Sequence, residues 1–385
     1  MRASNDASSC LILASYCFGT LTRVGFSNGG DSSGWQFVTR KVRDVDRFRG
    51  FFIALSLVSA AFPAPAFAWG PDGHHTVGAI ADKLIAGSNA AAEASAILGG
   101  LTLQQAAVWA DCAKGVDPTK DYAYTSAGQY PECAIYETPA GEAEMSDFVR
   151  RNDTNCARKP TEESCHKQYH YTDVAMQRNR YAAGSTGTRD DDIVAVVAAA
   201  THVLNGEPAP LPFSIKDKRE ALLLLTHYVG DIHQPLHVGA IYLDAQGKPV
   251  DPDSTGYDPA TDTRGGNQII IVSANVNYRG QNLHHTWDEI PATMTVSHVD
   301  SAWLAQARAV KRSRGALYDW PAIWATETLA QARLAFNGLK FGPKGGTDWT
   351  TSLPVSYGST MSSIKKKQLT KAGARLAQLL HGLWP

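Results

Sequence analysis

The sequence has little net charge, no closely spaced cysteine pair and no long apolar run. Its 385 residues carry 36 Lys and Arg against 37 Asp and Glu, a net charge of −1. Composition therefore predicts no broad basic surface for nucleic acid or membrane, and an anionic substrate would have to be attracted locally. No two cysteines have the C-x-x-C spacing of thiolate zinc sites. With 44% apolar and 19% charged residues, the chain has the composition of an ordinary globular protein.

The first 68 residues are typical of an N-terminal extension followed by a secretory signal peptide. Five Lys and Arg between positions 40 and 49 precede the short apolar stretch 51–62, and Ala66-Phe67-Ala68 forms a small-x-small cleavage motif. The apolar stretch is too short to span a bilayer; the alternative is a buried core helix. We expect residues 1–68 to be removed, leaving one domain, 69–385, that is secreted or periplasmic and makes no membrane contact.

Four cysteines follow position 68, namely Cys112, Cys133, Cys156 and Cys165. In an exported protein they predict two disulfides, for which three pairings exist. Cys156 and Cys165 bracket a short loop and are the favoured pair.

Helical patterns dominate the rest of the chain. Apolar periodicity or capping residues predict helices over 77–98, 101–111, 190–204, 222–233, 283–290, 301–313, 321–338 and 361–383. Segments 114–168 and 239–268 are rich in Gly, Pro and Asp and are expected to be loops. Residues 269–273 and 274–278 could form a hairpin. The predicted fold is mainly α, a single multi-helix domain with long loops and at most a small β-hairpin.

Two helical segments carry metal-ligand residue types four residues apart. His227 and Asp231 lie in HYVGDIHQPLH, which also contains His237, and His284 and Asp288 lie in NLHHTWDEI. Residues four apart lie on one face of a helix. An imidazole and a carboxylate on one face suit a divalent metal such as zinc.

Further ligand types occur upstream of these two segments. WGPDGH contains Trp69 and His74, WADC contains Asp111, and QYHYTD contains His170. Ligands on separate helices can converge in the core of a bundle. His233 and His285 stand beside the two motifs, but helical geometry points them elsewhere; His233 is expected either to support a ligand from behind or to serve packing.

The ordered motifs W-x4-H, WAD, HY, H-x3-D-x-H-Q-P-L-H, GGN and N-L-H-x3-D resemble the zinc-dependent single-strand nucleases and 3′-nucleotidases. The resemblance covers the chain from residue 69 onward. It implies the helical fold that this family shares with bacterial zinc phospholipase C, and a site for three Zn²⁺. The implied ligands are Asp111, His170, His227 and Asp231 for the first ion; His237, His284 and Asp288 for the second; and His74, Asp231 and the main chain of Trp69 for the third.

The resemblance also implies an activity, namely hydrolysis of single-stranded DNA or RNA to 5′-phosphates together with 3′-nucleotidase activity. Asp111 and Lys114 would serve catalysis, with Lys114 contacting phosphate, although it could be a solvated surface lysine. Tyr171 and Asp173 would bind a base by stacking and hydrogen bonding, although Tyr171 could be a core aromatic. Asn267 in GGN lies near the site without an assigned role. A monomer without a stable protein partner is expected.

Two other functions remain open from the sequence. One is a phospholipase C of the same fold, which the spacing of Trp69 and His74 and the aspartate at position 288 disfavour. The other is a secreted zinc-binding protein without catalysis, which the intact set of ligand residues disfavours.

Overall fold

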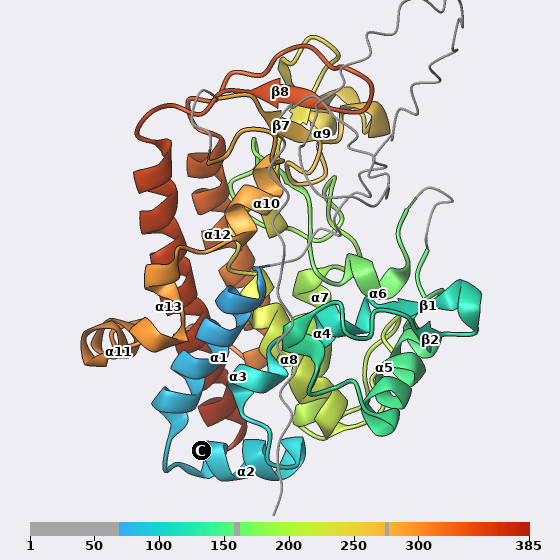
Figure 1. Cartoon of the computed structure of the whole chain (residues 1–385), viewed down its shortest axis with the longest axis vertical. Coiled ribbons are helices and arrows are strands. Elements are labelled where there is room, and N and C mark those ends of the chain that lie inside the picture. The colour runs from blue at the N-terminus through green and yellow to red at the C-terminus, as the bar shows by residue number, and fades with distance from the viewer. Residues whose placement is uncertain (1–68, 158–161, 274–276) are drawn as a thin grey trace, which may run out of the picture. The chain divides into compact units, whose positions relative to one another are not determined.

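The computed structural model describes residues 69–157, 162–273 and 277–385, all within the unit Pro63–Pro385. The predicted signal peptide and cleavage motif lie outside the described residues. Most of the described chain is helical (Figure 1). The helices are α1 (Pro71–Ile85), α2 (Asn89–Leu98), α3 (Leu103–Ala106), α4 (Trp109–Ala113), α5 (Pro139–Asn152), α6 (Cys165–Gln168), α7 (Ile193–Leu204), α8 (Lys218–Asp231), α9 (Pro252–Thr255), α10 (Leu283–Asp288), α11 (Ser301–Arg308), α12 (Trp320–Phe336) and α13 (Tyr357–Leu383).

The strands in the described residues are two or three residues long and pair in twos. The antiparallel pairs are β1 (Val116–Asp117) with β2 (Ala123–Tyr124) and β5 (Tyr242–Leu243) with β6 (Pro249–Val250). The parallel pairs are β3 (Val174–Ala175) with β4 (Gly239–Ala240) and β7 (Ile269–Ile271) with β8 (Trp349–Thr351). Short 3-10 turns are η1 (Pro118–Lys120), η2 (Pro131–Cys133), η3 (Pro235–His237), η4 (Pro259–Thr261), η5 (Ala292–Met294), η6 (Val296–His298) and η7 (Leu317–Asp319). The mainly α prediction is confirmed.

Helix α8 is the centre of the larger apolar cluster. Every residue from Glu220 to Asp231 is buried, and α7, α2, α3 and α4 pack against the helix. A helix enclosed on all sides is apolar around its circumference, which is why Leu222, Leu223, Leu224 and Leu225 occur in succession. The last two turns of this buried helix carry His227 and Asp231.

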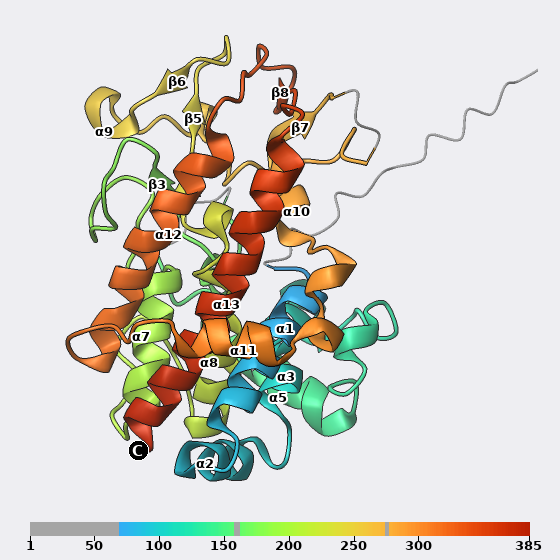
Figure 2. The ribbon, with the colours of Figure 1, turned by 90° about the vertical axis from the view of Figure 1, so that its left-hand side faces the viewer.

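The long helix α13 packs along α1, while α11 and α12 also touch it (Figure 2). The approach of α1 is close at Gly373, where an added Cβ would lie 2.5 Å from the Ile80 side chain. Contact at this distance requires glycine, because a larger residue would separate the helices. This packing holds the first helix, with His74, against the helical body.

Several predicted boundaries need correction. The single helix expected over 77–98 is interrupted at Gly87, which has φ +78°, and Ser88 caps α2 by accepting from Ala91 N. Segment 114–168 was expected to be loop, but it contains α5 and the single-turn α6. The strand expected at 269–273 is present as β7, but its ladder partner is β8, some 80 positions later in sequence, and the returning chain meets it in the isolated antiparallel bridge Ile270–Asn282. Residues 274–276 lie outside the described residues.

The helix starts follow local chemistry. Asp192 begins α7 by accepting from Val194 N and Ala195 N, as the acidic run at 190–192 predicts. Asp217 begins α8 by accepting from Glu220 N, so the aspartate itself is the N-cap of this helix.

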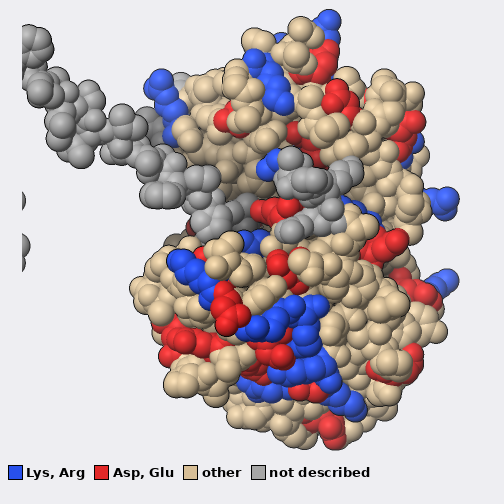
Figure 3. Space-filling view, turned by 90° about the vertical axis from the view of Figure 1, so that its right-hand side faces the viewer, with Lys and Arg blue, Asp and Glu red and all other residues tan. Residues whose placement is uncertain are grey.

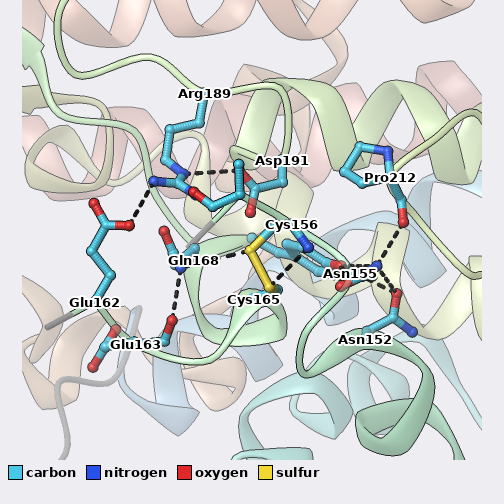
Figure 4. The surroundings of a disulfide bond; sticks show 12 residues. Asn152, Asn155, Cys156, Glu162, Glu163, Cys165, Gln168, Arg189, Asp191 and Pro212 are labelled. Carbon is cyan, nitrogen blue, oxygen red and sulfur yellow. Dashed lines mark hydrogen bonds and ion pairs between the residues drawn. A yellow bond between two sulfur atoms is a disulfide. The ribbon is translucent and has the colours of Figure 1, made fainter. Parts of the chain in front are cut away.

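Both predicted disulfides are present. Cys156 pairs with Cys165 and Cys112 with Cys133, which confirms the favoured pair. Around Cys156–Cys165, the Gln168 amide donates to Glu163 O (2.7 Å), and Arg189 forms ion pairs with Glu162 and with Asp191 (Figure 4). The bridge therefore fixes the segment that leads into His170.

Basic side chains form a band across the lower part of the face that carries α5, with acidic side chains along its edges (Figure 3). Arg151 on α5 illustrates this arrangement, since it forms ion pairs with Asp147 and with the buried Glu220. Nearby, Arg219 pairs with Glu144. Among the described residues, no helix combines the length and apolarity that crossing a bilayer requires.

Candidate metal centre

Histidine and aspartate side chains from α1, α4, α8, α10, η3 and the segment after α6 converge in the interior. Within each group, the potential ligand atoms lie no more than 4.8 Å apart. The first group is Asp111, His170 and His227, beside Asp231; the second group is His237, His284 and Asp288; and the third group is His74, His227 and Asp231. All eight side chains are buried. The sequence predicted each of them as a ligand.

The first group surrounds one oxygen of Asp231. Asp231 Oδ2 lies 3.0 Å from His170 Nδ1 and 3.1 Å from His227 Nε2. Asp111 Oδ1 lies 3.7 Å from each of these nitrogens. The four side chains expected at the first ion are thus brought together by three separate elements.

The other oxygen of Asp231 faces His74. Asp231 Oδ1 lies 3.1 Å from His74 Nε2, and the His74 ring stacks on His227 with the centroids 3.9 Å apart. One carboxylate therefore faces two groups of imidazoles, an arrangement suited to bridging two cations.

The start of the described chain lies against the same residues. The Trp69 indole is fully buried and donates to Gly230 O (2.9 Å), while Gly70 N donates to Asp288 O (3.0 Å). These contacts hold the main chain at position 69 close to the neighbours of Asp231 and Asp288.

The second group consists of two opposed imidazoles and a carboxylate. His237 Nε2 and His284 Nε2 are 3.0 Å apart. Asp288 Oδ1 lies 3.8 Å from His237 Nε2, and Asp288 Oδ2 lies 3.7 Å from His284 Nε2.

Main-chain carbonyls set the orientation of three imidazoles. His227 Nδ1 contacts Ala107 O at 2.6 Å, His237 Nδ1 contacts His170 O at 2.6 Å, and His284 Nδ1 contacts Gly265 O at 2.9 Å. A carbonyl only accepts, so each Nδ1 carries the proton and each Nε2 presents a lone pair.

The donor set fits divalent metal ions. In the second group two Nε2 lone pairs face each other at 3.0 Å, a repulsive contact that a shared cation would make favourable. Among the described residues, Asp288 Oδ2 is buried without a hydrogen-bond partner, and the 3.1 Å contact between His74 Nε2 and Asp231 Oδ1 lacks hydrogen-bond geometry. Buried polar atoms are nearly always satisfied, and metal coordination would satisfy these three. Nitrogen and carboxylate donors in this combination are typical of zinc.

The titration behaviour is consistent with that fit. Burial, reinforced by His227, lowers the pKa of His74 to about 4, and burial, reinforced by His237, lowers the pKa of His284 to about 3. Both rings are therefore neutral near pH 7, the form that a metal requires. Burial also raises the pKa of Asp288 well above its usual range, and a neighbouring cation would favour its ionised form.

Lys114 stands at the edge of the first group. Its Nζ lies 2.7 Å from Asp111 Oδ1, and its side chain is only 12% exposed. This contact excludes the reading of Lys114 as a freely solvated surface lysine. Its ammonium group faces the cluster from the end of α4.

Tyr171 and Asp173, proposed to bind a base, directly follow His170 and are half-buried. Asp173 O accepts from the Tyr242 hydroxyl (2.9 Å). Burial, together with the charge of Asp262, raises the pKa of the Asp173 carboxyl well above its usual range. Because Tyr171 is half-buried, its ring can serve either to stack on a base or to pack within the protein.

The GGN motif acts through its main chain. Gly265, at φ +57°, turns its carbonyl toward His284 Nδ1, and the Asn267 amide donates to Arg264 O (3.0 Å). A left-handed turn of this kind favours glycine. Asn267 therefore bonds within the turn, while Gly265, which sequence reasoning did not single out, orients the ligand.

His233 and His285 do not join the metal groups. His233 Nδ1 contacts Val229 O at 2.8 Å, and its Nε2 contacts Arg375 Nη1 at 3.0 Å. His285 is half-buried on α10. His233 therefore points away from the metal groups, as its spacing from Asp231 predicts.

The fold and site define a mainly helical protein built around a cluster of candidate metal-binding residues. A model of the S1/P1 nuclease family, described as S1/P1 Nuclease, matches residues 69–384. The chain therefore belongs to the S1/P1 nuclease family.

Among curated proteins, similarity is found to plant endonucleases. Endonuclease 5 of Arabidopsis thaliana is 28% identical over 181 residues, 43% of this chain and 51% of that protein. Endonuclease 1 of the same plant is 30% identical over 178 residues, 42% and 48% of the two chains. Endonuclease 2 is 28% identical over 235 residues, 58% and 69%. The chain thus spans about half the length of the first two relatives.

Proposed function

We propose that this protein is an exported, zinc-dependent nuclease. It would hydrolyse single-stranded DNA or RNA to 5′-phosphate products and remove 3′-phosphates from nucleotides. The observation that carries the proposal is the pair of opposed imidazole nitrogens of His237 and His284, 3.0 Å apart, beside the cluster around Asp231. Membership of the S1/P1 nuclease family supports phosphodiester bonds as the target.

The proposed cofactor is three Zn²⁺. Asp111, His170, His227 and Asp231 would hold the first ion, and His237, His284 and Asp288 the second. His74, Asp231 and the main chain of Trp69 would hold the third. When bound, clustered zinc ions supply Lewis-acid stabilisation and activate water for attack on phosphorus.

The surrounding residues would position the substrate. The Lys114 ammonium group, held 2.7 Å from Asp111 Oδ1, can stabilise charge on the phosphate oxygens. Tyr171 offers a ring on which a base can stack, and Asp173 offers a hydrogen-bonding carboxyl group. Stacking requires an unpaired base, which accounts for a preference for single strands.

Export and processing belong to the same proposal. Residues 1–68 would be removed, which would leave the α-amine of Trp69 free as a ligand; zinc binding requires this amine in its deprotonated form. The two disulfides are compatible with an oxidising, secreted or periplasmic location. The mature protein, residues 69–385, would act as a monomer without a stable protein partner.

The test combines metal analysis with hydrolysis assays on protein that begins at Trp69. We expect about three zinc ions per chain, faster cleavage of single-stranded than duplex DNA, loss of activity with a chelator and recovery with zinc. Hydrolysis of phosphatidylcholine in preference to DNA would favour a phospholipase C. Zinc binding without hydrolysis of any phosphate ester would favour a non-catalytic protein.

A further inference from the structure

Gln234 is a buried side chain within the metal-binding turn that has no role in the proposed chemistry. It lies between Asp231 and His237 and is fully buried. Its Nε2 donates to Asp288 Oδ1 (2.6 Å), and its Oε1 accepts from Leu236 N. One amide therefore joins α10, which carries Asp288, to η3, which carries His237.

The chemistry of its two partners fixes the orientation of this amide. A backbone N–H donates only, so Oε1 must face Leu236 N, which leaves the Nε2 donor for Asp288 Oδ1. A rotated amide would lose the hydrogen bond from Leu236 N. Gln234 is thus held in one conformation by the segments that it joins.

The contact also distinguishes the two oxygens of Asp288. Oδ1 receives the Gln234 hydrogen bond, whereas Oδ2 has no hydrogen-bond partner among the described residues and lies 3.7 Å from His284 Nε2. The amide therefore leaves one carboxylate oxygen available as a ligand and limits rotation of the carboxylate group.

We propose that Gln234 is a positioning residue that sets Asp288 and His237 for the metal ion shared by His237, His284 and Asp288. This inference rests on the zinc site in the proposed function. Partners that orient metal ligands typically change metal affinity by about 10–100-fold when they are removed.

The turn has separate anchors on its outer side. Gln368 Nε2 donates to His233 O (2.8 Å), and Arg375 Nη1 contacts His233 Nε2. Removal of the Gln234 amide therefore leaves the backbone of the turn tied to α13. Its effect should be local to the second metal group.

The experiment compares Gln234→Met with unmutated protein, both beginning at Trp69, by zinc content across a series of zinc buffers. We expect the variant to bind one of its zinc ions about 10–100-fold more weakly, so that this ion is retained only at correspondingly higher free zinc. The affinity for the remaining zinc should not change. Hydrolysis of single-stranded DNA should fall at low free zinc and recover as zinc is added. Because zinc binding also stabilises the folded state, folding of both proteins is checked separately by far-UV circular dichroism at saturating zinc.

Gln378→Met is the matched control, because Gln378 on α13 donates to Val310 O (2.7 Å) and lies outside the metal groups. Its zinc titration should match that of the unmutated protein.

Gln234→Glu keeps the acceptor for Leu236 N but removes the donor to Asp288. It should therefore lower the affinity for the same zinc ion, and it decides the question if Gln234→Met does not fold. Unmutated zinc affinity in both Gln234 variants would overturn the inference. A failure of the unmutated protein to bind zinc would instead overturn the proposed function.

Discussion

His237 and His284 face each other through Nε2 atoms 3.0 Å apart, while each Nδ1 contacts a main-chain carbonyl. The carbonyls fix the tautomer, so neither Nε2 can donate to the other while both rings are neutral. Burial lowers the pKa of both rings, which makes relief by protonation unfavourable near pH 7. A metal ion held by both rings would remove the conflict.

Substitution of His284 should remove this metal. We expect His284→Ala to lose about one zinc per chain and more than about 100-fold of its activity on single-stranded DNA, beyond the usual effect of losing an orienting partner. The adjacent His285→Ala, on the same helix but outside the metal groups, is the control and should keep both properties. Equal losses in the two variants would contradict the assignment.

Substitution of Lys114 should affect catalysis while leaving zinc bound. Lys114→Met removes a positive charge that faces the first group, and we expect kcat/KM to fall by about 10²–10³-fold, the usual result of losing one group that stabilises transition-state charge. Zinc content should not change. Lys120→Met is the control, because Lys120 is exposed and forms its ion pair, among the described residues, with Asp117. Unchanged kinetics in Lys114→Met would exclude a role in phosphate binding.

The free amine at Trp69 should be needed for the third zinc. A chain that retains residues 63–68 has an amide nitrogen at Trp69, which cannot replace an amine as ligand. We expect this form to bind one zinc fewer than protein that begins at Trp69 and to be nearly inactive. Zinc analysis before and after enzymatic removal of the extension is the measurement, and full activity of the extended form is the outcome that contradicts it.

His166 should make stability depend on pH. Burial, with smaller contributions from Lys167 and Lys114, lowers the pKa of His166 from 6.5 to about 3. The unfolded chain therefore takes up a proton that the folded chain does not, and stability is lost as pH falls from 6.5 toward 3. His166→Leu should flatten the dependence by up to about 1.4 kcal/mol per pH unit.

Denaturant unfolding at several pH values measures this difference. The exposed His298 serves as the control, and His298→Ala should follow the unmutated curve. Parallel curves for His166→Leu and the unmutated protein would show that His166 does not contribute.

Helices with a full apolar pattern could be predicted from the sequence, and those without one could not. The spacing of Leu369, Leu376 and Leu380 predicted α13, and all three side chains are buried. Helix α5 was missed because its buried apolar side chains are only Met145, Phe148 and Val149. Its capped start at Thr138, followed by Pro139, was a local signal that could have revealed it.

The pairing of β7 with β8 could not be predicted, because a parallel register between distant segments depends on the whole fold.

At the metal centre, residue type and i, i+4 spacing predicted which side chains of each helix are candidate ligands, and the family resemblance predicted how the helices combine. The carbonyls of Ala107 and Gly265 were not predictable, since every residue has a carbonyl and only the fold decides which one an imidazole meets. Gln234 lies within the H-Q-P-L-H motif, but its contact with Asp288 depends on the packing of α10.

The imidazoles of His227 and His237 are steered by main-chain oxygen atoms of Ala107 and His170. An oxygen of the peptide group survives any substitution that preserves the backbone. The side chain at position 107 can therefore change, within the space available there, without changing the orientation of the His227 ring. Divergent relatives should accordingly retain the geometry of the centre more faithfully than the identities of the residues that aim its histidines.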